Sequence, residues 1–506
     1  MSRCKSASRP AERFGRSVGA LRKTLTSAIC LCAAVGLVPL RADAETMSSA
    51  LSRAYMGNPD LNQQRASVRA TDENLPRALS GFRPTVTGTG NAGVAYQENR
   101  ADLAPGSSSS STSSGTGSGA ASGSGGGSST IHVHTQNLSF PRGVGVSVQQ
   151  NFYNGERTRN SAKQAESQID AARETMRLTE QNTLQNGATA YMNVLRDTAI
   201  LNLRKNNITV LEEQLRQTRD RFEVGEVTRT DVAQAQSSLA QARSDFYTAQ
   251  ANLQNSIANY RQIIGVEPRR LEPAQTIEKL LPKTLTAAIT LGLVEHPGIV
   301  AAFHQVDIAA LNVKIQEGAL LPSLNAVLSV NQNWDPSGIP RTQVLTAVGQ
   351  LQLNVPIYQG GIEYANIRQA KEQLGQARLN ADLQRDTVRA TIVSTWGLLE
   401  TARATIYSAQ SAVTAAEIAL AGTREEARVG QRTTLDVLNA QQTLLNARVS
   451  LVSAQRDRVV ASYAVYAAIG KLTAENLGLD VILYDPTVHF DQVKGKWWGT
   501  QNPDWR

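Results

Sequence analysis

The chain contains two copies of one pattern, and this repeat limits its fold more than any other feature. The motif Val224-Gly225-x-x-Thr228 returns as Val429-Gly430-x-x-Thr433, at an offset of 205 residues. Tyr153 and Tyr358 keep the same offset, so neither insertion nor deletion separates the copies over this span. A gapless tandem repeat indicates that each half builds the same supersecondary unit.

The two copies differ in length upstream of these tyrosines. Pro84 and Pro322 are 238 residues apart, which places 33 extra residues in the first copy between Pro84 and Tyr153. Residues 106–130 fill most of this difference and consist only of Gly, Ser, Thr and Ala. Such a segment has too little apolar surface to fold by itself. We therefore predict a disordered loop at the tip of a hairpin, on the outer, aqueous side of a membrane.

The first 44 residues predict a secretory signal peptide. Basic residues precede an apolar run over 25–38, and Ala42-Asp43-Ala44 offers small residues for cleavage before Glu45. All three cysteines lie in this leader, so the exported chain has no thiol for a disulfide, a metal or a nucleophile.

Without the leader, the net charge of the chain falls from +8 to +2. The basic character therefore gives no support for nucleic acid as a partner. Beyond the leader, we expect no stretch with the roughly 18 apolar residues of a membrane-spanning helix. Any membrane-spanning part of the exported chain is then expected to consist of strands.

Long helices are predicted in both copies, because Pro is missing from residues 142–267 and 357–485. The longest are expected at about 155–224 and 360–429, and shorter helices at about 47–80 and 284–319. Large apolar residues recur every seven positions in the first copy, at Leu201, Ile208, Leu215 and Phe222 and then at Val232, Leu239, Phe246, Leu253 and Tyr260. This spacing predicts a coiled-coil seam between two antiparallel helices in each copy.

Between the helices, apolar and polar residues alternate with a period of two. Residues 85–96 and 144–152 form one such pair of segments, and residues 324–334 and 351–357 form another. Each copy thus offers one hairpin, and the chain offers four strands. Four strands cannot close a barrel in lipid, since the smallest barrels have about eight. Several chains must therefore combine, and the periodicity alone allows two or three.

Four short motifs resemble those of a known family. They are Arg221-Phe222-Glu223-Val224-Gly225, Thr230-Asp231-Val232, Pro356-Ile357-Tyr358-Gln359-Gly360-Gly361 and Val429-Gly430-x-Arg432-Thr433-x-x-Asp436-Val437-Leu438. With the duplicated order of helix, hairpin and long helices, the chain over about residues 45–475 resembles the TolC family of outer-membrane efflux and secretion proteins. The resemblance implies an α+β membrane protein, mainly α, whose homotrimer forms a 12-stranded outer-membrane β-barrel continued by a long helical coiled-coil tunnel in the periplasm.

The resemblance also implies a function and its partners. The chain is expected to be the outer-membrane exit duct of a tripartite efflux pump or a type I secretion system in a Gram-negative bacterium. Its partners would be outer-membrane lipid, a periplasmic adaptor protein and an inner-membrane RND or ABC transporter. The expected domains are a first repeat at 45–265, a linker at 266–283, a second repeat at 284–475 and a C-terminal extension at 476–506, which either joins a belt around the tunnel or hangs free.

The family closes its tunnel at the turns between the long helices, and the matching positions here are candidate gate residues. Gly225 and Gly430 suit the left-handed conformation that ends a helix, and a capping box follows each turn. The resemblance assigns the closing contacts to Gln214, Thr230, Asp231 and Arg432. We expect Arg432 to bond Thr230 and Asp231; the alternative is a solvated surface arginine.

Some positions depart from the family pattern at this gate. An aromatic position of the family holds Ala427 here, and an acidic position holds Arg424. The aperture ring of the family has two carboxylates per chain, and the matching residues are Asp436 and Asn439. One carboxylate per chain predicts weaker block by multivalent cations.

Two other classes of function stay open at this point. The chain could be an exported coiled-coil scaffold with soluble hairpins, or a diffusion porin that works without partners. We expect no enzyme, no cofactor and no metal site, because the sequence has neither a nucleophile motif nor a phosphate loop. The sequence does not distinguish drugs from secreted proteins as the substrate.

Overall fold

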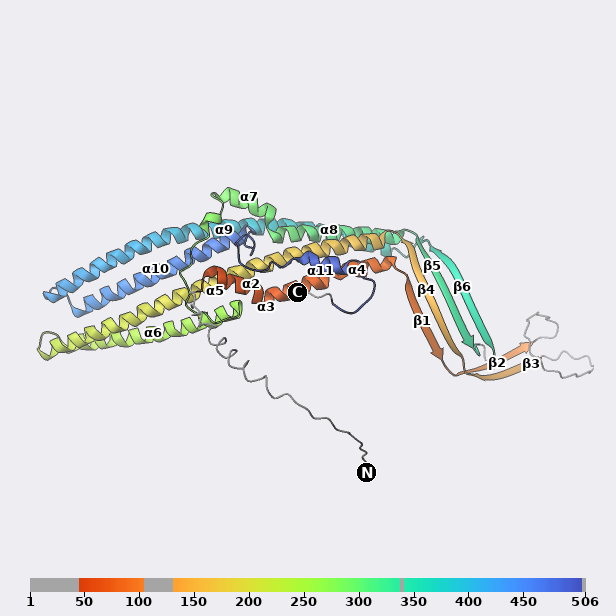
Figure 1. Ribbon diagram of the computed structural model, residues 1–506, viewed down its shortest axis with the longest axis horizontal. Coiled ribbons are helices and arrows are strands. Elements are labelled where there is room, and N and C mark those ends of the chain that lie inside the picture. Colours follow the sequence, from red (N-terminus) through yellow and green to blue (C-terminus); the bar gives the residue numbers. More distant parts are fainter. Residues whose placement is uncertain (1–44, 104–130, 337–340, 503–506) are drawn as a thin grey trace, which may run out of the picture.

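A computed structural model describes residues 45–103, 131–336 and 341–502. The predicted signal peptide (1–44) and the predicted loop (106–130) lie outside these ranges. The chain is elongated, with long helices at one end and strands at the other (Figure 1). The helices of the first copy are α2 (Met47–Gly57), α3 (Pro59–Asp72), α4 (Asn74–Leu79), α5 (Arg157–Glu223) and α6 (Arg229–Ile264). Those of the second copy are α7 (Leu285–Glu295), α8 (Pro297–Glu317), α9 (Ile362–Arg428) and α10 (Thr434–Ala468).

The long helices are confirmed, but the shorter helix predicted before each hairpin is divided. Residues 47–79 form the three helices α2, α3 and α4. Asn58 starts the second of them: its side chain accepts hydrogen bonds from the N–H groups of Asp60 and Leu61. Pro59 follows at the first helical position, where its missing N–H costs nothing. In the second copy His296 and Pro297 divide α7 from α8 in the same way.

Four strands form one antiparallel sheet in the order β1-β4-β5-β6. Their bounds are Thr85–Ala92 for β1, Arg142–Asn154 for β4, Ser323–Trp334 for β5 and Gln343–Asn354 for β6. Each copy therefore contributes one hairpin, as predicted, and β4 pairs with β5 to join the copies. The sequence did not reveal a separate two-stranded ribbon, β2 (Ala95–Leu103) with β3 (Ile131–Ser139), which extends from the far end of the sheet (Figure 1).

The register of the sheet separates a polar face from an apolar face. Thr87, Ser147 and Ser329 are paired neighbours on the polar face, and the hydroxyls of Thr87 and Ser147 are 2.6 Å apart. Their chain neighbours Val148 and Leu328 pair on the opposite face, which is apolar. All charge except Arg142 is missing from these four strands. The two faces suit a wall with lipid on one side and water on the other.

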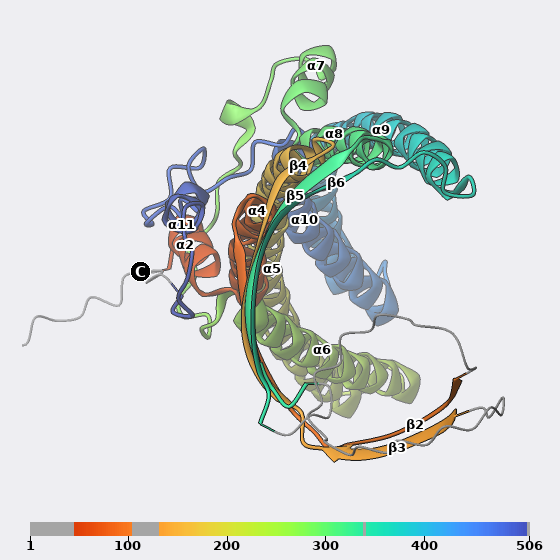
Figure 2. The ribbon, with the colours of Figure 1, turned by 90° about the vertical axis from the view of Figure 1, so that its right-hand side faces the viewer.

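Each long helix packs against the shorter helix that follows it, as the heptads predict. Leu215 and Leu239 are buried between α5 and α6, and Leu420 and Leu444 are buried between α9 and α10. Helix α10 also contacts α5, so the two copies form one curved layer (Figure 2).

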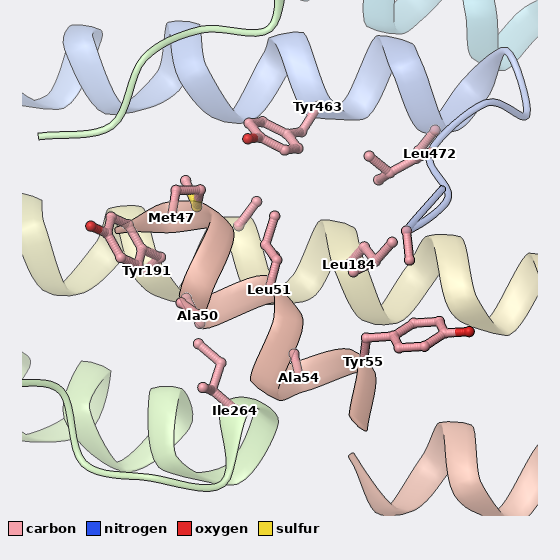
Figure 3. Close-up of a cluster of buried hydrophobic side chains, with 14 of the residues drawn as sticks. Met47, Ala50, Leu51, Ala54, Tyr55, Leu184, Tyr191, Ile264, Tyr463 and Leu472 are labelled. Carbon is pink, nitrogen blue, oxygen red and sulfur yellow. The ribbon is translucent and has the colours of Figure 1, made fainter. Parts of the chain in front are cut away.

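The largest core gathers side chains from both copies (Figure 3). There Leu51 of α2 is buried among side chains of α5, α6 and α10, including Leu184, Ile264 and Tyr463. The expected first residue of the exported chain, Glu45, pairs with Leu271 of the linker in a parallel bridge. This core therefore holds both copies and the linker together.

The expectation that no helical stretch beyond the leader is apolar enough for a membrane is wrong. Among the described residues, Leu285–Leu320 passes that test by length and composition. The segment is divided at Pro297, however, and α8 packs along α5 and α9. Helix α7 covers a core that includes Ile392 and Ile469. These contacts place both helices on the wall of the helical layer.

The C-terminal extension packs against the helices, so the alternative that it hangs free is wrong for the described residues. Its helix α11 (Pro486–Val493) lies against α3 (Figure 1). Leu477, Leu479 and Val481 pack on the large core.

Candidate functional site

The two turns between the long helices lie together at the end of the molecule farthest from the sheet (Figure 1). In the first turn, Gly225 has φ +79° and the N–H of Glu226 donates to the carbonyl of Arg221 at 2.9 Å. In the second, Gly430 has φ +80° and the N–H of Gln431 donates to the carbonyl of Glu426 at 2.9 Å. Only glycine adopts this φ without strain, so both tip turns depend on it.

A capping box opens the helix after each turn, as the sequence predicts. The N–H of Thr228 donates to Asp231 Oδ2 at 2.9 Å, and the N–H of Asp231 donates to Thr228 Oγ1 at 3.3 Å. Thr433 and Asp436 repeat this exchange at 3.0 and 3.2 Å. The bonds from the backbone and hydroxyl of Thr433 lower the pKa of Asp436.

Each turn also carries an ion pair. The arginine precedes the glycine in the first turn and follows it in the second. In the first turn, Arg221 Nε donates to Glu226 Oε2 at 2.9 Å. In the second, Arg432 Nε donates to Glu426 Oε2 at 2.9 Å, and this bond raises the pKa of Arg432. The Arg432 side chain remains 55% exposed. The arginine therefore has a carboxylate partner on its own turn and faces solvent.

The predicted bond from Arg432 to Thr230 and Asp231 does not occur within the single described chain. Thr230 is exposed, and the Asp231 carboxylate bonds Thr228. These three residues lie on different turns of the tip, so their meeting in an assembly stays a prediction.

Gln214 lines a groove of about 590 Å³ between α5 and α9, near the turns. Both departures from the family pattern, Ala427 and Arg424, line the same groove. Charged side chains of both signs border it, including Glu213 and Arg428. The short Ala427 side chain also packs against the apolar seam between α9 and α10.

Asp436 and Asn439 lie one helical turn apart at the start of α10. Asn439 is exposed, and its carbonyl accepts a bond from Thr443 Oγ1 at 2.9 Å. Of this predicted ring, only Asp436 brings a carboxylate.

The seam between the copies contains a polar contact that was not predicted from the sequence. Leu438 of α10 is buried among α5 and α6 side chains, and one turn later Gln441 Nε2 lies 3.4 Å from Asn207 Oδ1 of α5. Both amides are buried, and Gln441 Oε1 has no hydrogen-bond partner among the described residues. The two amide residues could have signalled this contact. Their pairing was not predictable, however, because α5 and α10 are far apart in the sequence.

Comparison with known proteins identifies this arrangement. A family model described as outer membrane efflux protein matches residues 50–266 and 288–471, which is most of the chain. The chain belongs to the outer membrane efflux protein family. Outer membrane efflux protein BepC of Brucella suis is 40% identical over 484 residues, covering 96% of this chain and 98% of that protein.

More distant members share the same length and fold. Outer membrane protein TolC of Vibrio cholerae is 25% identical over 88% of this chain and 95% of its own. The solved CmeC outer membrane channel of Campylobacter jejuni is 18% identical, with a TM-score of 0.70 and coverage of 89% of each chain. The resemblance and the fold class predicted from the sequence are confirmed.

Family membership establishes the general role of the chain. It is a non-enzymatic outer-membrane efflux channel of tripartite efflux or secretion systems, and it lies in the outer membrane of a Gram-negative bacterium. Members of the family form trimers that act with periplasmic adaptors and inner-membrane pumps. The alternative of an exported coiled-coil scaffold is therefore wrong.

Proposed function

We propose that three copies of this chain form one passive duct, with a 12-stranded barrel in the outer membrane and a helical tunnel in the periplasm. The sheet of one chain supports this proposal, because β1 and β6 each leave one edge unpaired among the described strands. An unpaired edge in lipid leaves backbone groups without hydrogen bonds, so neighbouring chains must supply them. The curvature of the helical layer suits a tube (Figure 2).

The duct is gated at its tip, and the exposed ion pair of Arg432 is the observation that carries this part of the proposal. Arg432 uses only Nε for Glu426, and a guanidinium has four further N–H donors. In the assembled tip those donors bond Thr230 and Asp231 and hold the turns together. Because the contact is exposed, a protein partner can break it at little cost.

The groove around Gln214 is the docking place for that partner. Its length along α5 and α9, and charges of both signs, suit an α-helical hairpin of a periplasmic adaptor. The adaptor connects the tip to an inner-membrane transporter of the RND or ABC class, which supplies the energy.

The domain boundaries follow the same plan. We assign residues 1–44 to a cleaved signal peptide and residues 45–265 and 284–475 to the two repeats. Residues 266–283 link the repeats, and residues 476–506 form the C-terminal extension. Two separate matches to the family model, over 50–266 and 288–471, support this division.

A gene deletion tests the function and distinguishes the two pump classes. With an RND partner, the deletion strain becomes sensitive to drugs and detergents, and its secreted proteins stay unchanged. With an ABC secretion partner, one or a few secreted proteins disappear from the medium. Complementation with the wild-type gene must restore the phenotype. If the strain shows neither change although the wild-type protein is present as trimers in the outer membrane, the export role is wrong.

A further inference from the structure

The C-terminal extension runs as a strap along α3, and specific side chains hold it there. The Tyr484 N–H donates to Tyr55 Oη at 3.1 Å. The Arg65 guanidinium lies between these two rings, 4.5 Å from the Tyr55 centroid and 5.3 Å from that of Tyr484. Both contacts are typical of cation–π packing, so the strap is fixed where it leaves the large core.

A buried contact between a histidine and an aspartate fixes the strap at its helix. His489 Nδ1 of α11 lies 2.9 Å from Asp72 Oδ2, and the Asp72 side chain is fully buried. The Phe490 ring packs under the guanidinium of Arg173 on α5, 5.1 Å from its centroid. A buried carboxyl group needs a hydrogen-bond partner, so this contact favours the docked position of the strap.

The strap then reaches the boundary between the helices and the sheet. Arg83, two residues before β1, donates from Nη1 to the carbonyl of Lys496 at 2.8 Å. The same guanidinium lies 4.7 Å from the ring centroid of Trp497. The strap is therefore anchored at the level where the barrel strands begin (Figure 1).

At this level the strap presents two adjacent tryptophans to the outside. Trp497 is 63% exposed and Trp498 is 88% exposed, although α11 and the bond from Arg83 to Lys496 hold the backbone just before them. Other exposed aromatic residues occur at the same end of the sheet: Phe82 before β1, Phe152 and Tyr153 at the end of β4, and Tyr358 after β6. Together these side chains form an aromatic band at the base of the strands.

We propose that Trp497 and Trp498 insert into the headgroup region of the periplasmic leaflet, so that the strap anchors the tunnel to phospholipid. Tryptophan is enriched where a membrane protein crosses from lipid to water, because the ring is apolar and its N–H bonds the interface. The apolar face of the sheet indicates where the lipid lies. The two tryptophans of the strap lie at the end of this face that is nearest the helices. The cation of Arg83 beside Trp497 suits the phosphates of the same layer.

Quenching of tryptophan emission by brominated phospholipid tests this anchor. The probe is the full-length trimer in phosphatidylethanolamine and phosphatidylglycerol vesicles, with bromine either near the headgroup end or near the methyl end of the acyl chains. A reporter with Trp334, Trp396 and Trp505 replaced by Phe keeps only the two strap tryptophans. We expect its emission to fall with bromine near the headgroup and to fall less with bromine deep in the bilayer.

Two further variants make the result decisive. A control that keeps only Trp396, a buried residue of α9, should show no quenching by either lipid. In a background with Trp334 replaced by Phe, because Trp334 lies on the apolar face of β5, W497F/W498F changes only exposed side chains and should remove most of the quenching by bromine near the headgroup. Equal quenching of the strap reporter and the Trp396 control, or unchanged quenching in W497F/W498F, would overturn the proposal.

Discussion

At the residue scale, the two aspartates of the tip act first as helix caps. Asp231 and Asp436 each bond the backbone and hydroxyl of the threonine three residues earlier. This arrangement was predictable, because Thr-x-x-Asp after a glycine turn is a local signal. The partner of Arg432 was not, since Glu426 lies on the other side of a turn whose shape the sequence does not specify.

The cap at Asp436 makes the second turn sensitive to acid. The bonds from Thr433 lower the pKa of Asp436, so the carboxylate stabilises the turn above the ordinary Asp pKa, and this stability is lost as the pH falls through the lowered pKa. Amide hydrogen exchange at Thr433, corrected for the intrinsic rate, should therefore accelerate over that acidic range. In Asp436→Asn the exchange should be fast at every pH. Exchange at Thr433 that does not depend on pH would contradict this account.

The single carboxylate per chain at the aperture predicts the response to cations. A trimer has three copies of Asp436 in that ring, and Asn439 adds none. Multivalent cations should block the wild-type channel weakly in single-channel recordings. Asn439→Asp doubles the carboxylates and should tighten the block by roughly tenfold or more, since two charges at about 4 Å interact by several kcal/mol at an effective dielectric of 20. Tight wild-type block that persists in Asp436→Asn would contradict the assignment of this ring.

At the element scale, the long helices and their seams followed directly from the sequence. Windows without Pro and heptads of large residues are local signals, and Leu215, Leu239, Leu420 and Leu444 are buried as expected. The ribbon β2–β3 was missed because its strands lack the apolar alternation of the main sheet: Glu98, Arg100 and Asp102 fill alternate positions of β2. His296-Pro297 was a local signal for the break between α7 and α8. One continuous helix was predicted there because apolar residues continue on both sides of the proline.

The buried amides in the seam between the copies make that seam weaker than a fully apolar one. Gln441 Oε1 has no partner in the described part of the chain, and an unsatisfied buried polar group costs about 1–3 kcal/mol. Replacing both amides, as Asn207→Leu with Gln441→Leu, should raise the melting temperature of the trimer. It should also reduce spontaneous openings of the channel, because α10 then separates from α5 less easily. Gln442→Leu, at an exposed neighbouring position, is the matched control. A double variant that melts at or below the wild-type temperature would show that the amide pair does not weaken the seam.

At the scale of the whole molecule, the sequence predicted the arrangement of one chain but not the number of chains that close the barrel. The repeat predicts two hairpins and two helical pairs, and the structure shows both. Nothing in the periodicity of one chain states how many chains close the wall, because each open edge is satisfied by a neighbour outside the sequence. The course of the C-terminal strap was also not predictable, since single contacts dock it on helices distant in sequence: His489 with Asp72 of α3 and the Tyr484 N–H with Tyr55 of α2.

The central claim is a duct that is closed at its tip until partners open it, and the conductance of the purified trimer in a planar bilayer tests it most directly. The wild-type channel should conduct poorly without its pump, and Arg432→Ala or Asp231→Ala should raise the conductance several-fold. Arg448→Ala, which removes an exposed ion pair with Glu417 on the same helical pair, should leave it unchanged. A wild-type channel that is already fully open, as in a diffusion porin, or a low conductance that neither gate variant raises, would contradict the account.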